Sequence, residues 1–573
     1  MTLIGSHAGE RGSPRCQQNE TELRNCLVQT LQMVKVNCSS EGQRGLYKSE
    51  ARGQNKISLS NLTMSIQKQR RRIFPVRTAL AICLFWSACG AYESLAVAGE
   101  HDHPVPEKLG VVKFPTSCSA DVQKEFERAV ALLHSFAYSA AEKAFRDVMA
   151  SDPNCAMAHW GVAMTYFHQL WEPHLAPEDV ARGAQEMDEA KRIGCSERER
   201  GFIEALSIIY ANVDSVPYHE RANAYTRAMG KLAGRNPDDA ECQVFYALAL
   251  LATASPADKT HANEKKAAAI LEPLFQKYPE HPGVPHYLIH ACDNSEMATR
   301  GLEAARRYSQ IATSAPHALH MPSHIYTRLG MWDESIASNL AAQKAARAQG
   351  DKGEELHAMD YLVYAYLQLG RDADAARVLD ELRAIPRLDG SDFKIGYAAS
   401  AMPARYAIER RQWREATQLV PLDRALPQVL AITLWTRSVA FARDTKPDAA
   451  RQEIEKLKSA HEKLSAAGDD YWATLVHAQL NEALAWTAHA EGKHDEALEL
   501  MHAAAGEEDA IEKRPVTPGA IIPAREQLGD LLLETNHPQQ AVKEFERALE
   551  MNPNRRNALM GSARAREMLA GAK

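Results

Sequence analysis

The feature that most constrains the fold is a 34-residue spacing of small and large apolar residues. Counting back from Pro553 as position 32 of such a unit, positions 7, 8, 11, 20, 24 and 27 are Leu528, Gly529, Leu532, Ala541, Phe545 and Ala548. The small residues let two antiparallel helices approach closely, and the large ones fill the seam between them. The spacing therefore predicts a helix pair that buries its apolar face by stacking on neighbouring pairs.

Further copies of this pattern occur along the chain. Counting back from Pro153 in the same way gives Leu132, Ala141, Phe145 and Val148. A turn glycine at position 15 marks three more units, at Gly330, Gly370 and Gly492. The spacing between units varies, so several units should have longer helices. At about 40 residues per helix pair, the chain holds about a dozen pairs.

On these residues the chain resembles the tetratricopeptide-repeat family, most strongly at the C-terminus and also at 119–153 and 316–385. The resemblance implies an all-α fold, an α-solenoid in which helix pairs form a right-handed superhelix with a concave groove. It also implies a scaffold or binding protein rather than an enzyme, with a peptide, a protein partner or a small polar ligand in the groove. No catalytic residue is assigned.

The first 98 residues have the layout of a targeting sequence. Met64 is followed by a basic stretch ending at Arg77, an apolar run over 79–86, and the small-x-small site Ala96-Val97-Ala98. This is the order of a secretory signal peptide, and the apolar run is too short to span a membrane. We expect an exported, periplasmic or secreted protein. A signal anchor behind a cytoplasmic tail and a lipoprotein anchored at Cys89 are the alternatives.

These patterns divide the chain into six segments. We expect a non-native or disordered extension (1–63), a signal peptide (64–98), an extended segment (99–117), a repeat solenoid with a histidine-lined groove (118–385), degenerate helical repeats (386–514), and a final repeat with a capping helix (515–573). Pro515 to Gly519 reads as a rigid surface linker before the final repeat. No other segment is apolar enough to span a membrane.

The charge distribution restricts the class of partner. The chain carries a formal net charge of −7, and its first 98 residues are basic, so the remainder is more acidic still. An acidic body argues against nucleic-acid binding and against an anionic membrane surface. In the last repeat Glu526, Asp530 and Glu534 fall on groove positions, which suits a basic partner.

Five cysteines follow the signal segment. Cys118 and Cys155 open consecutive helical units, so we predict that they pair in an oxidising compartment. The alternative is that all five are buried small apolar residues.

The histidines are the most informative residues for function. His286 and His290 are spaced i, i+4, and His320 and His324 repeat that spacing one unit later. Residues four apart lie on one face of a helix, so each pair projects two imidazoles in the same direction. The family resemblance implies that positions 2, 5 and 9, on the first helix of each successive pair, line the groove. The residues predicted there, or one turn further along, are His286, His290, Asp293, His317, His320, His324, Arg328, His357, Asp360 and Tyr364.

Three interpretations of this cluster stay open from the sequence. One is a transition-metal site, in which His286, His290, His320 and His324 hold Zn, Cu or Ni. A metal-dependent hydrolase would add Asp360 or Asp293 as general base. The second is a groove for a polar organic ligand or peptide, which needs no cofactor. The third is structural. A separate Cu or Ni site would arise at Gly99-Glu100-His101 if cleavage follows Ala98.

Overall fold

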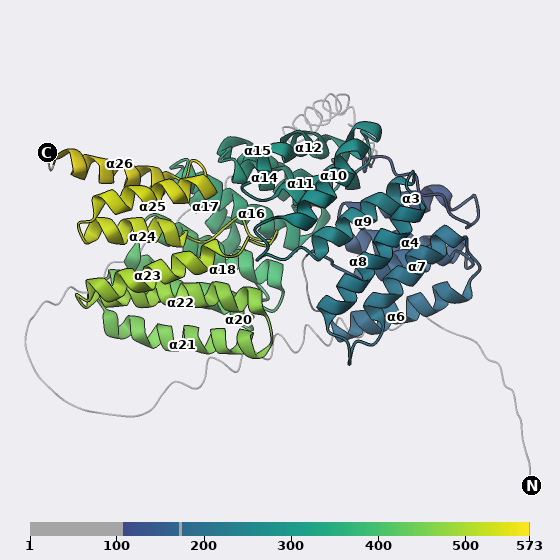
Figure 1. Ribbon diagram of the computed structural model, residues 1–573. Coiled ribbons are helices and arrows are strands. Elements are labelled where there is room, and N and C mark those ends of the chain that lie inside the picture. Colours follow the sequence, from purple (N-terminus) through teal and green to yellow (C-terminus); the bar gives the residue numbers. More distant parts are fainter. Residues whose placement is uncertain (1–106, 171–174, 572–573) are drawn as a thin grey trace, which may run out of the picture. The chain divides into compact units, whose positions relative to one another are not determined.

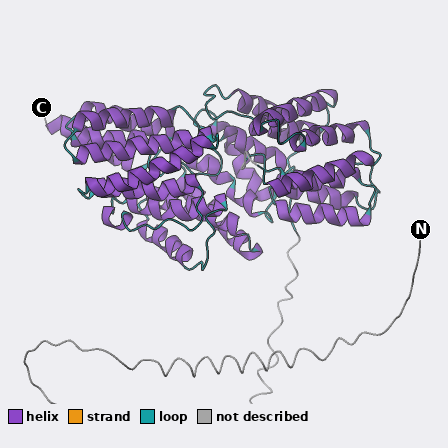
Figure 2. Ribbon diagram, turned by 90° about the horizontal axis from the view of Figure 1, so that it is seen from below, coloured by secondary structure: helices purple, strands orange, loops and turns teal. Residues whose placement is uncertain are grey.

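The computed structural model describes residues 107–170 and 175–571, and all regular secondary structure in these residues is helical (Figures 1 and 2). The predicted extension (1–63), signal peptide (64–98), lipoprotein cysteine and metal-binding start at residue 99 lie outside the described residues. Of the expected extended segment, residues 107–116 contain no helix. Among the described helices, none combines the length and the apolarity that a membrane crossing requires.

The first part of the solenoid consists of paired helices. They are α3 (Gln123–His134), α4 (Tyr138–Ser151), α5 (Ala156–Tyr166), α6 (Pro177–Arg192), α7 (Glu197–Tyr210), α8 (Tyr218–Arg235), α9 (Ala240–Ala252), α10 (Ala262–Lys277), α11 (Gly283–Cys292) and α12 (Ala298–Ile311). Each helix packs on the next in sequence, and α3 also contacts α5, α5 contacts α7, and α9 contacts α11. Stacking of alternate helices is the contact pattern of a helical solenoid.

The second part continues the pattern. Its helices are α13 (Pro316–His320), α14 (Pro322–Arg328), α15 (Trp332–Gln349), α16 (Lys352–Gln368), α17 (Asp372–Arg383), α18 (Phe393–Glu409), α19 (Trp413–Ala416), α20 (Pro427–Arg443), α21 (Pro447–Ala466), α22 (Asp470–Ala490), α23 (His494–Asp509), α24 (Ala524–Glu534), α25 (Pro538–Met551) and α26 (Arg556–Gly571). α13 and α14 together take the place of one first helix, divided before Pro322, which lacks the backbone N–H that would continue it.

The seams between paired helices confirm the repeat pattern. A Cβ atom on Gly529 would lie 2.7 Å from the ring of Phe545 in the same pair, and one on Gly161 of α5 would lie 2.3 Å from the ring of Phe145 in the preceding pair. Glycine at 529 therefore admits the large residue that the sequence pattern pairs with it, and Gly161 allows the same close approach between neighbouring pairs. The predicted all-α solenoid is confirmed.

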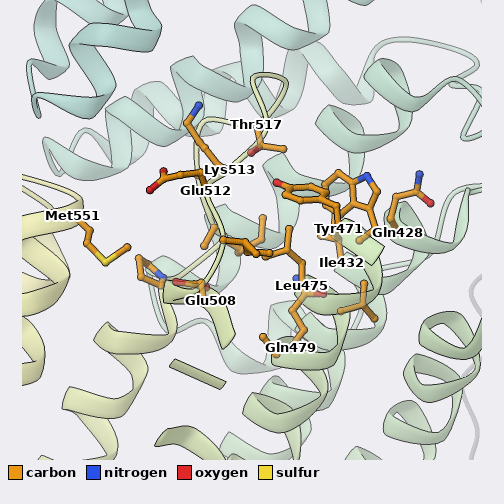
Figure 3. A pocket seen from close by; sticks show the side chains of 18 of the residues that line it. Gln428, Ile432, Tyr471, Leu475, Gln479, Glu508, Glu512, Lys513, Thr517 and Met551 are labelled. Atoms are coloured by element: carbon orange, nitrogen blue, oxygen red, sulfur yellow. The ribbon is translucent and has the colours of Figure 1, made fainter. Parts of the chain in front are cut away.

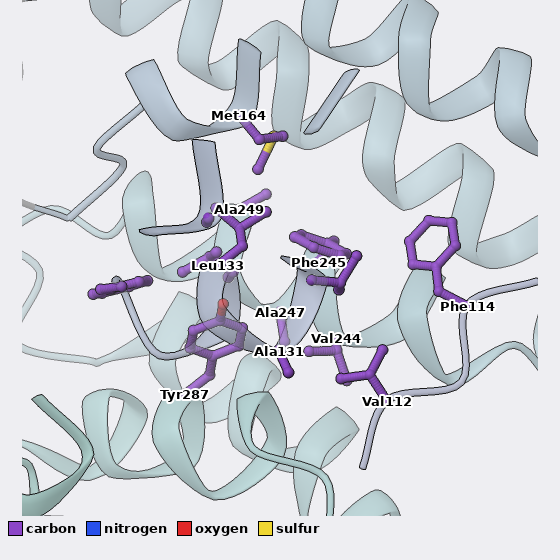
Figure 4. Packing of buried hydrophobic residues seen from close by; sticks show 14 of the residues in the cluster. Val112, Phe114, Ala131, Leu133, Met164, Val244, Phe245, Ala247, Ala249 and Tyr287 are labelled. Carbon is purple, nitrogen blue, oxygen red and sulfur yellow. The ribbon is translucent and has the colours of Figure 1, made fainter. Parts of the chain in front are cut away.

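The buried apolar residues form three clusters rather than one continuous core. The first extends from Leu109 to Tyr326, the second from Trp332 to Met402 and the third from Tyr397 to Ala565. Figure 4 shows part of the first, with Phe114 of the extended segment at one side of the cluster. The ring centroid of Phe202 lies 5.2 Å from that of Phe114 and 5.9 Å from that of Phe245. The ring centroid of Phe114 is 5.4 Å from that of Phe126. The extended segment is thus part of the N-terminal core.

Cys118 and Cys155 form a disulfide with an Sγ–Sγ distance of 2.03 Å. It joins the start of the first helix pair to the residue that precedes α5. Of the other cysteines in the described residues, Cys242 and Cys292 are buried and Cys195 is partly exposed, and all three are free thiols.

The C-terminal repeat contacts the middle of the solenoid as well as its neighbours in sequence. The indole Nε1 of Trp332 donates to the carbonyl oxygen of Asn554 at 3.1 Å. A Cβ atom on Gly330, whose φ is +64°, would lie 2.4 Å from the carbonyl oxygen of Pro553. Glycine is required at this turn both for its left-handed backbone and for the close approach.

Arg555 extends this contact into the interior. Its guanidinium pairs with Glu409 at 2.7 Å and with Glu526 at 2.8 Å, and it donates to the hydroxyl of Tyr364 at 2.9 Å. The Arg555 side chain is fully buried, so these contacts form deep between the final repeat, α16 and α18.

The predicted surface linker is wrong. Residues 516–519 are buried, and the carbonyl oxygens of Gly519 and Ala520 accept hydrogen bonds from the guanidinium of Arg405. The carbonyl oxygen of Thr517 accepts one from the hydroxyl of Tyr361 at 3.3 Å. The proline- and glycine-rich segment lies against α16 and α18 because buried side chains satisfy its backbone carbonyls, which removes the cost of burying them.

Candidate functional site

Six histidines from three successive first helices meet in the interior. α11 supplies His286 and His290, α13 and α14 supply His317, His320 and His324, and α16 supplies His357. Their exposed fractions are between 0 and 7%. The ligand atoms fall into two groups, each within 4.8 Å: His286, His290 and His317 form set A, and His320, His324 and His357 form set B. The four histidines predicted as metal ligands are thus divided between two sets, and each set gains a third histidine.

In set A, Nε2 of His286 lies 3.1 Å from Nε2 of His290. Nδ1 of His286 is 2.5 Å from the backbone carbonyl oxygen of His134. A carbonyl oxygen only accepts, so Nδ1 of His286 carries the proton and its Nε2 has a lone pair directed at His290.

In set B, hydrogen bonding leaves two lone pairs facing each other. Nδ1 of His324 donates to Asp293 at 2.9 Å, and Nδ1 of His320 donates to Oδ1 of Asn339 at 2.7 Å. The orientation of the Asn339 amide is fixed, because its Nδ2 donates to the carbonyl oxygen of Ser335. Both neutral imidazoles are therefore protonated on Nδ1, yet their Nε2 atoms are only 3.0 Å apart. Two acceptors at this distance repel each other unless a proton or a metal ion lies between them. The Tyr361 hydroxyl lies 3.5 Å from Nε2 of His324.

Two buried carboxylates hold the histidines from behind, one for each set. Asp293 accepts from His324 in set B, and Glu354 lies 3.3 Å from Nδ1 of His317 in set A. Asp293 is itself held by Arg328 at 2.9 Å and by Lys513 at 2.8 Å. Carboxylates that bond the outer nitrogen of a histidine fix its ring and raise its basicity, as they do around protein-bound metals.

The protonation states suit ligation. Burial lowers the pKa of His286, His290, His320 and His357 well below the ordinary value for histidine. Burial also lowers the pKa of His324 to about 4, despite its bond to Asp293. Burial alone would raise the pKa of Asp293, but Lys513, Arg328 and His324 hold it well below its usual range. At neutral pH these five imidazoles are neutral, the form that binds metals.

The remaining predicted residues do not join the two sets. Tyr364 bonds Arg555 and packs against Trp332, with ring centroids 5.4 Å apart. Asp360 is buried and its carboxylate has no hydrogen bond, with Nε of Arg405 at 3.8 Å. Burial raises the pKa of Asp360 to about 6, although Arg405 opposes this.

Sequence reasoning missed three residues of the site. The ring centroid of Tyr361 is 4.7 Å from that of His320 and 5.3 Å from that of His324. Its position four residues after His357 was a usable signal. No local sequence pattern identifies Asn339 or Lys513. Asn339 lies on the second helix of its pair, and Lys513 is 220 residues from its partner Asp293 in sequence.

Comparison with known proteins agrees with the repeat geometry. Residues 522–555 match the family model described as the tetratricopeptide repeat, over the same unit that the 34-residue spacing defines. The chain therefore contains a tetratricopeptide repeat at residues 522–555. A search of curated proteins finds no relative of the chain.

Several solved structures match most of this chain at low sequence identity. The Cut9–Hcn1 hetero-tetramer of the APC/C is 13% identical, covers 80% of this chain and 82% of its own, and gives a TM-score of 0.32. The tetratricopeptide-repeat domain of P58(IPK) is 12% identical over 79% and 99% of the two chains, at a TM-score of 0.21. The human IFIT1 dimer with m7Gppp-AAAA is 12% identical over 72% and 90%, at a TM-score of 0.33.

A third histidine cluster in the described residues is structural. His134 and His281 each bond one oxygen of Glu241, at 2.9 and 2.8 Å. The second nitrogen of His134 bonds the Tyr287 hydroxyl, and that of His281 accepts from the backbone N–H of Gly283. All four ring nitrogens are engaged within the protein, which leaves none for an ion.

The acidic residues predicted to meet a basic partner are paired within the chain instead. Glu526 pairs with Arg555, Asp530 with Arg411 at 2.8 Å, and Glu534 with Arg443 at 2.6 Å. The chain supplies its own basic groups at this end of the solenoid.

A separate pocket of about 120 Å³ lies between α22 and the segment that follows α23 (Figure 3). Tyr471 and Leu475 of α22 line one side, with Glu508 and Lys513 on the other. Glu482 is buried at this pocket. Burial raises the pKa of Glu508 to about 7, and the nearby carboxylates of Asp509 and Glu526 add to the rise, while the backbone N–H of Ala524 and Arg555 oppose it.

This raised pKa predicts that stability falls as the pH rises. The carboxyl of Glu508 has a pKa of about 7 in the folded state and of about 4.3 in the unfolded chain. Its contribution to stability is fully present below about pH 4.3 and is lost as the pH rises to about 7. The free energy of unfolding of Glu508→Gln, relative to that of the wild type, should therefore increase by about 1–3 kcal/mol from pH 5 to pH 8. This range lies below the full value that the pKa difference gives, because solvent screens the partly exposed side chain. Urea unfolding at both pH values measures this. A difference between the two proteins that does not change with pH would contradict it.

Proposed function

We propose that this protein is a repeat scaffold that binds a transition-metal ion in its buried histidine cluster. The observation that carries the proposal is the facing pair of lone pairs on His320 and His324, 3.0 Å apart. Two imidazole nitrogens at about 2.0–2.1 Å from one ion subtend an angle of about 91–97° at this separation, which is nearer to the angle of square-planar Cu(II) or Ni(II) than to that of a tetrahedral ion. An ion removes the repulsion between the two lone pairs without breaking the bonds to Asn339 and Asp293.

The burial of these histidines distinguishes a metal from the other ligands considered. A peptide lying in an open groove needs side chains that it can touch, and these are at most 7% exposed. An ion needs only a coordination shell, and neutral imidazoles suit Zn, Cu or Ni. Binding of protein partners, which the tetratricopeptide-repeat fold fits, would then use other surfaces of the solenoid.

The arrangement gives less support to a metal-dependent hydrolase. Of the two carboxylates considered as general base, Asp293 is engaged by His324, Arg328 and Lys513. Asp360 belongs to neither histidine set. The proposal is therefore metal binding, with no catalytic residue assigned.

The test is the metal content of the untagged full-length chain after export and mild chelator washing. We expect at least one equivalent of Cu, Zn or Ni by mass spectrometry, and loss of most of it in a His320→Ala plus His324→Ala variant. The matched control is His489→Ala plus His494→Ala, because those rings also touch, with Nδ1 atoms 3.1 Å apart at the surface. Metal-free wild-type protein, or equal loss in both variants, would overturn the proposal.

A further inference from the structure

The two histidine sets repeat one arrangement one unit apart. Each combines an i, i+4 pair on one first helix with a single histidine from the start of the next: His317 completes set A and His357 completes set B. Each set also has its own buried carboxylate, Glu354 behind His317 and Asp293 behind His324. A repeated set of three histidines, each set with a buried carboxylate, points to two sites rather than one shared site, although the carboxylate bonds the single histidine in set A and a member of the pair in set B.

The two sets are in contact. The ring centroids of His290 and His324 are 5.8 Å apart, and those of His317 and His320 are 6.0 Å apart. Ions held by these rings would occupy adjoining positions. Protein sites that hold two ions about 3.5–4 Å apart let one small molecule contact both.

The donor chemistry favours copper. All six candidate ligands are imidazoles, and no carboxylate or thiolate of the described residues belongs to either set. Copper binds nitrogen donors most tightly among the divalent first-row metals. Three protein ligands leave a coordination position open, as in catalytic metal sites. A cavity of about 150 Å³ lined by His290 and Asp293 adjoins set A and offers space for a small ligand at that position.

We propose that sets A and B each bind one copper ion, and that the two ions form a single dinuclear centre with an open position for a small bridging ligand. This inference rests on the proposed function, and it adds the number of ions, their identity and their proximity.

The experiment loads the full-length protein with Cu(II), removes excess by desalting, and measures total copper together with the copper visible by electron paramagnetic resonance. We expect two copper ions per chain, with a signal well below two spins because neighbouring ions couple. Two ions with full signal would overturn the dinuclear centre. One ion per chain would overturn the pair but leave the proposed function standing. No retained copper would overturn the copper centre, and the Zn and Ni content of the wild-type protein would then decide the proposed function separately.

Single-set variants give an independent readout. His286→Ala in set A and His357→Ala in set B should each retain one copper ion per chain and recover the signal of an isolated ion. His489→Ala, at the surface, should retain two ions and the weak signal. A variant that keeps its circular dichroism spectrum but loses both ions would overturn the assignment of one ion to each set. If either variant fails to fold, the wild-type copper count and spin count still decide the question.

Discussion

Replacing Arg555 with methionine should lower the free energy of unfolding by about 3–5 kcal/mol. The side chain is fully buried and neutralises two carboxylates, Glu409 at 2.7 Å and Glu526 at 2.8 Å. Its removal leaves two buried like charges without a counter-ion, which costs far more than losing a surface ion pair. Urea unfolding followed by circular dichroism at pH 7 measures the change.

Two further variants test the cause of this loss. Arg566→Met removes an ion pair with Glu546 whose side chains are 60 and 50% exposed, so it should cost less than about 1 kcal/mol. Adding Glu409→Gln to Arg555→Met should recover part of the lost stability, because one uncompensated charge disappears. A similar loss in Arg555→Met and Arg566→Met would show that the buried network contributes little.

Loss of the disulfide should have an effect of similar size. Cys118 and Cys155 are 37 residues apart in sequence. A closed loop of that length restricts the unfolded chain by about 4 kcal/mol in the chain-entropy description. The double variant Cys118→Ser plus Cys155→Ser should therefore unfold at a lower urea concentration, with the loss centred on the N-terminal apolar cluster.

The free thiols provide the control for the disulfide prediction. Cys195→Ser should leave the unfolding midpoint unchanged, because this partly exposed thiol has no disulfide to lose. Reductant should destabilise the wild type and the Cys195 variant equally and leave the double variant unaffected. A wild-type midpoint that is the same with and without reductant would contradict the prediction.

The fold could be predicted because its determinants repeat locally. Small residues at a fixed spacing from large ones, as at Gly529 and Phe545, recur along the chain and identify the helix pairs. The recurrence of His286 and His290 as His320 and His324 likewise identified the helices of the candidate site. Within a repeat, sequence distance and spatial distance are closely linked.

The enclosure of the site could not be predicted in the same way, because its causes lie far apart in sequence. The segment 513–519 bonds Tyr361 through Thr517, 156 residues away, and bonds Asp293 through Lys513, 220 residues away. A proline- and glycine-rich stretch usually indicates a solvent-exposed turn. Here the interior supplies donors such as Arg405 for its carbonyls, and no local pattern carries that information.

The contact between Asn554 and Trp332, 222 residues apart, has a consequence for how the protein is made. A solenoid whose units contact only their neighbours can acquire structure unit by unit as it leaves the ribosome. In this chain, the guanidinium that neutralises Glu409 and Glu526 and bonds Tyr364 belongs to Arg555, which follows Tyr364 by 191 residues. The middle of the molecule therefore reaches its final packing only once Arg555 has been made, so products truncated before it should be open and readily cleaved by proteases.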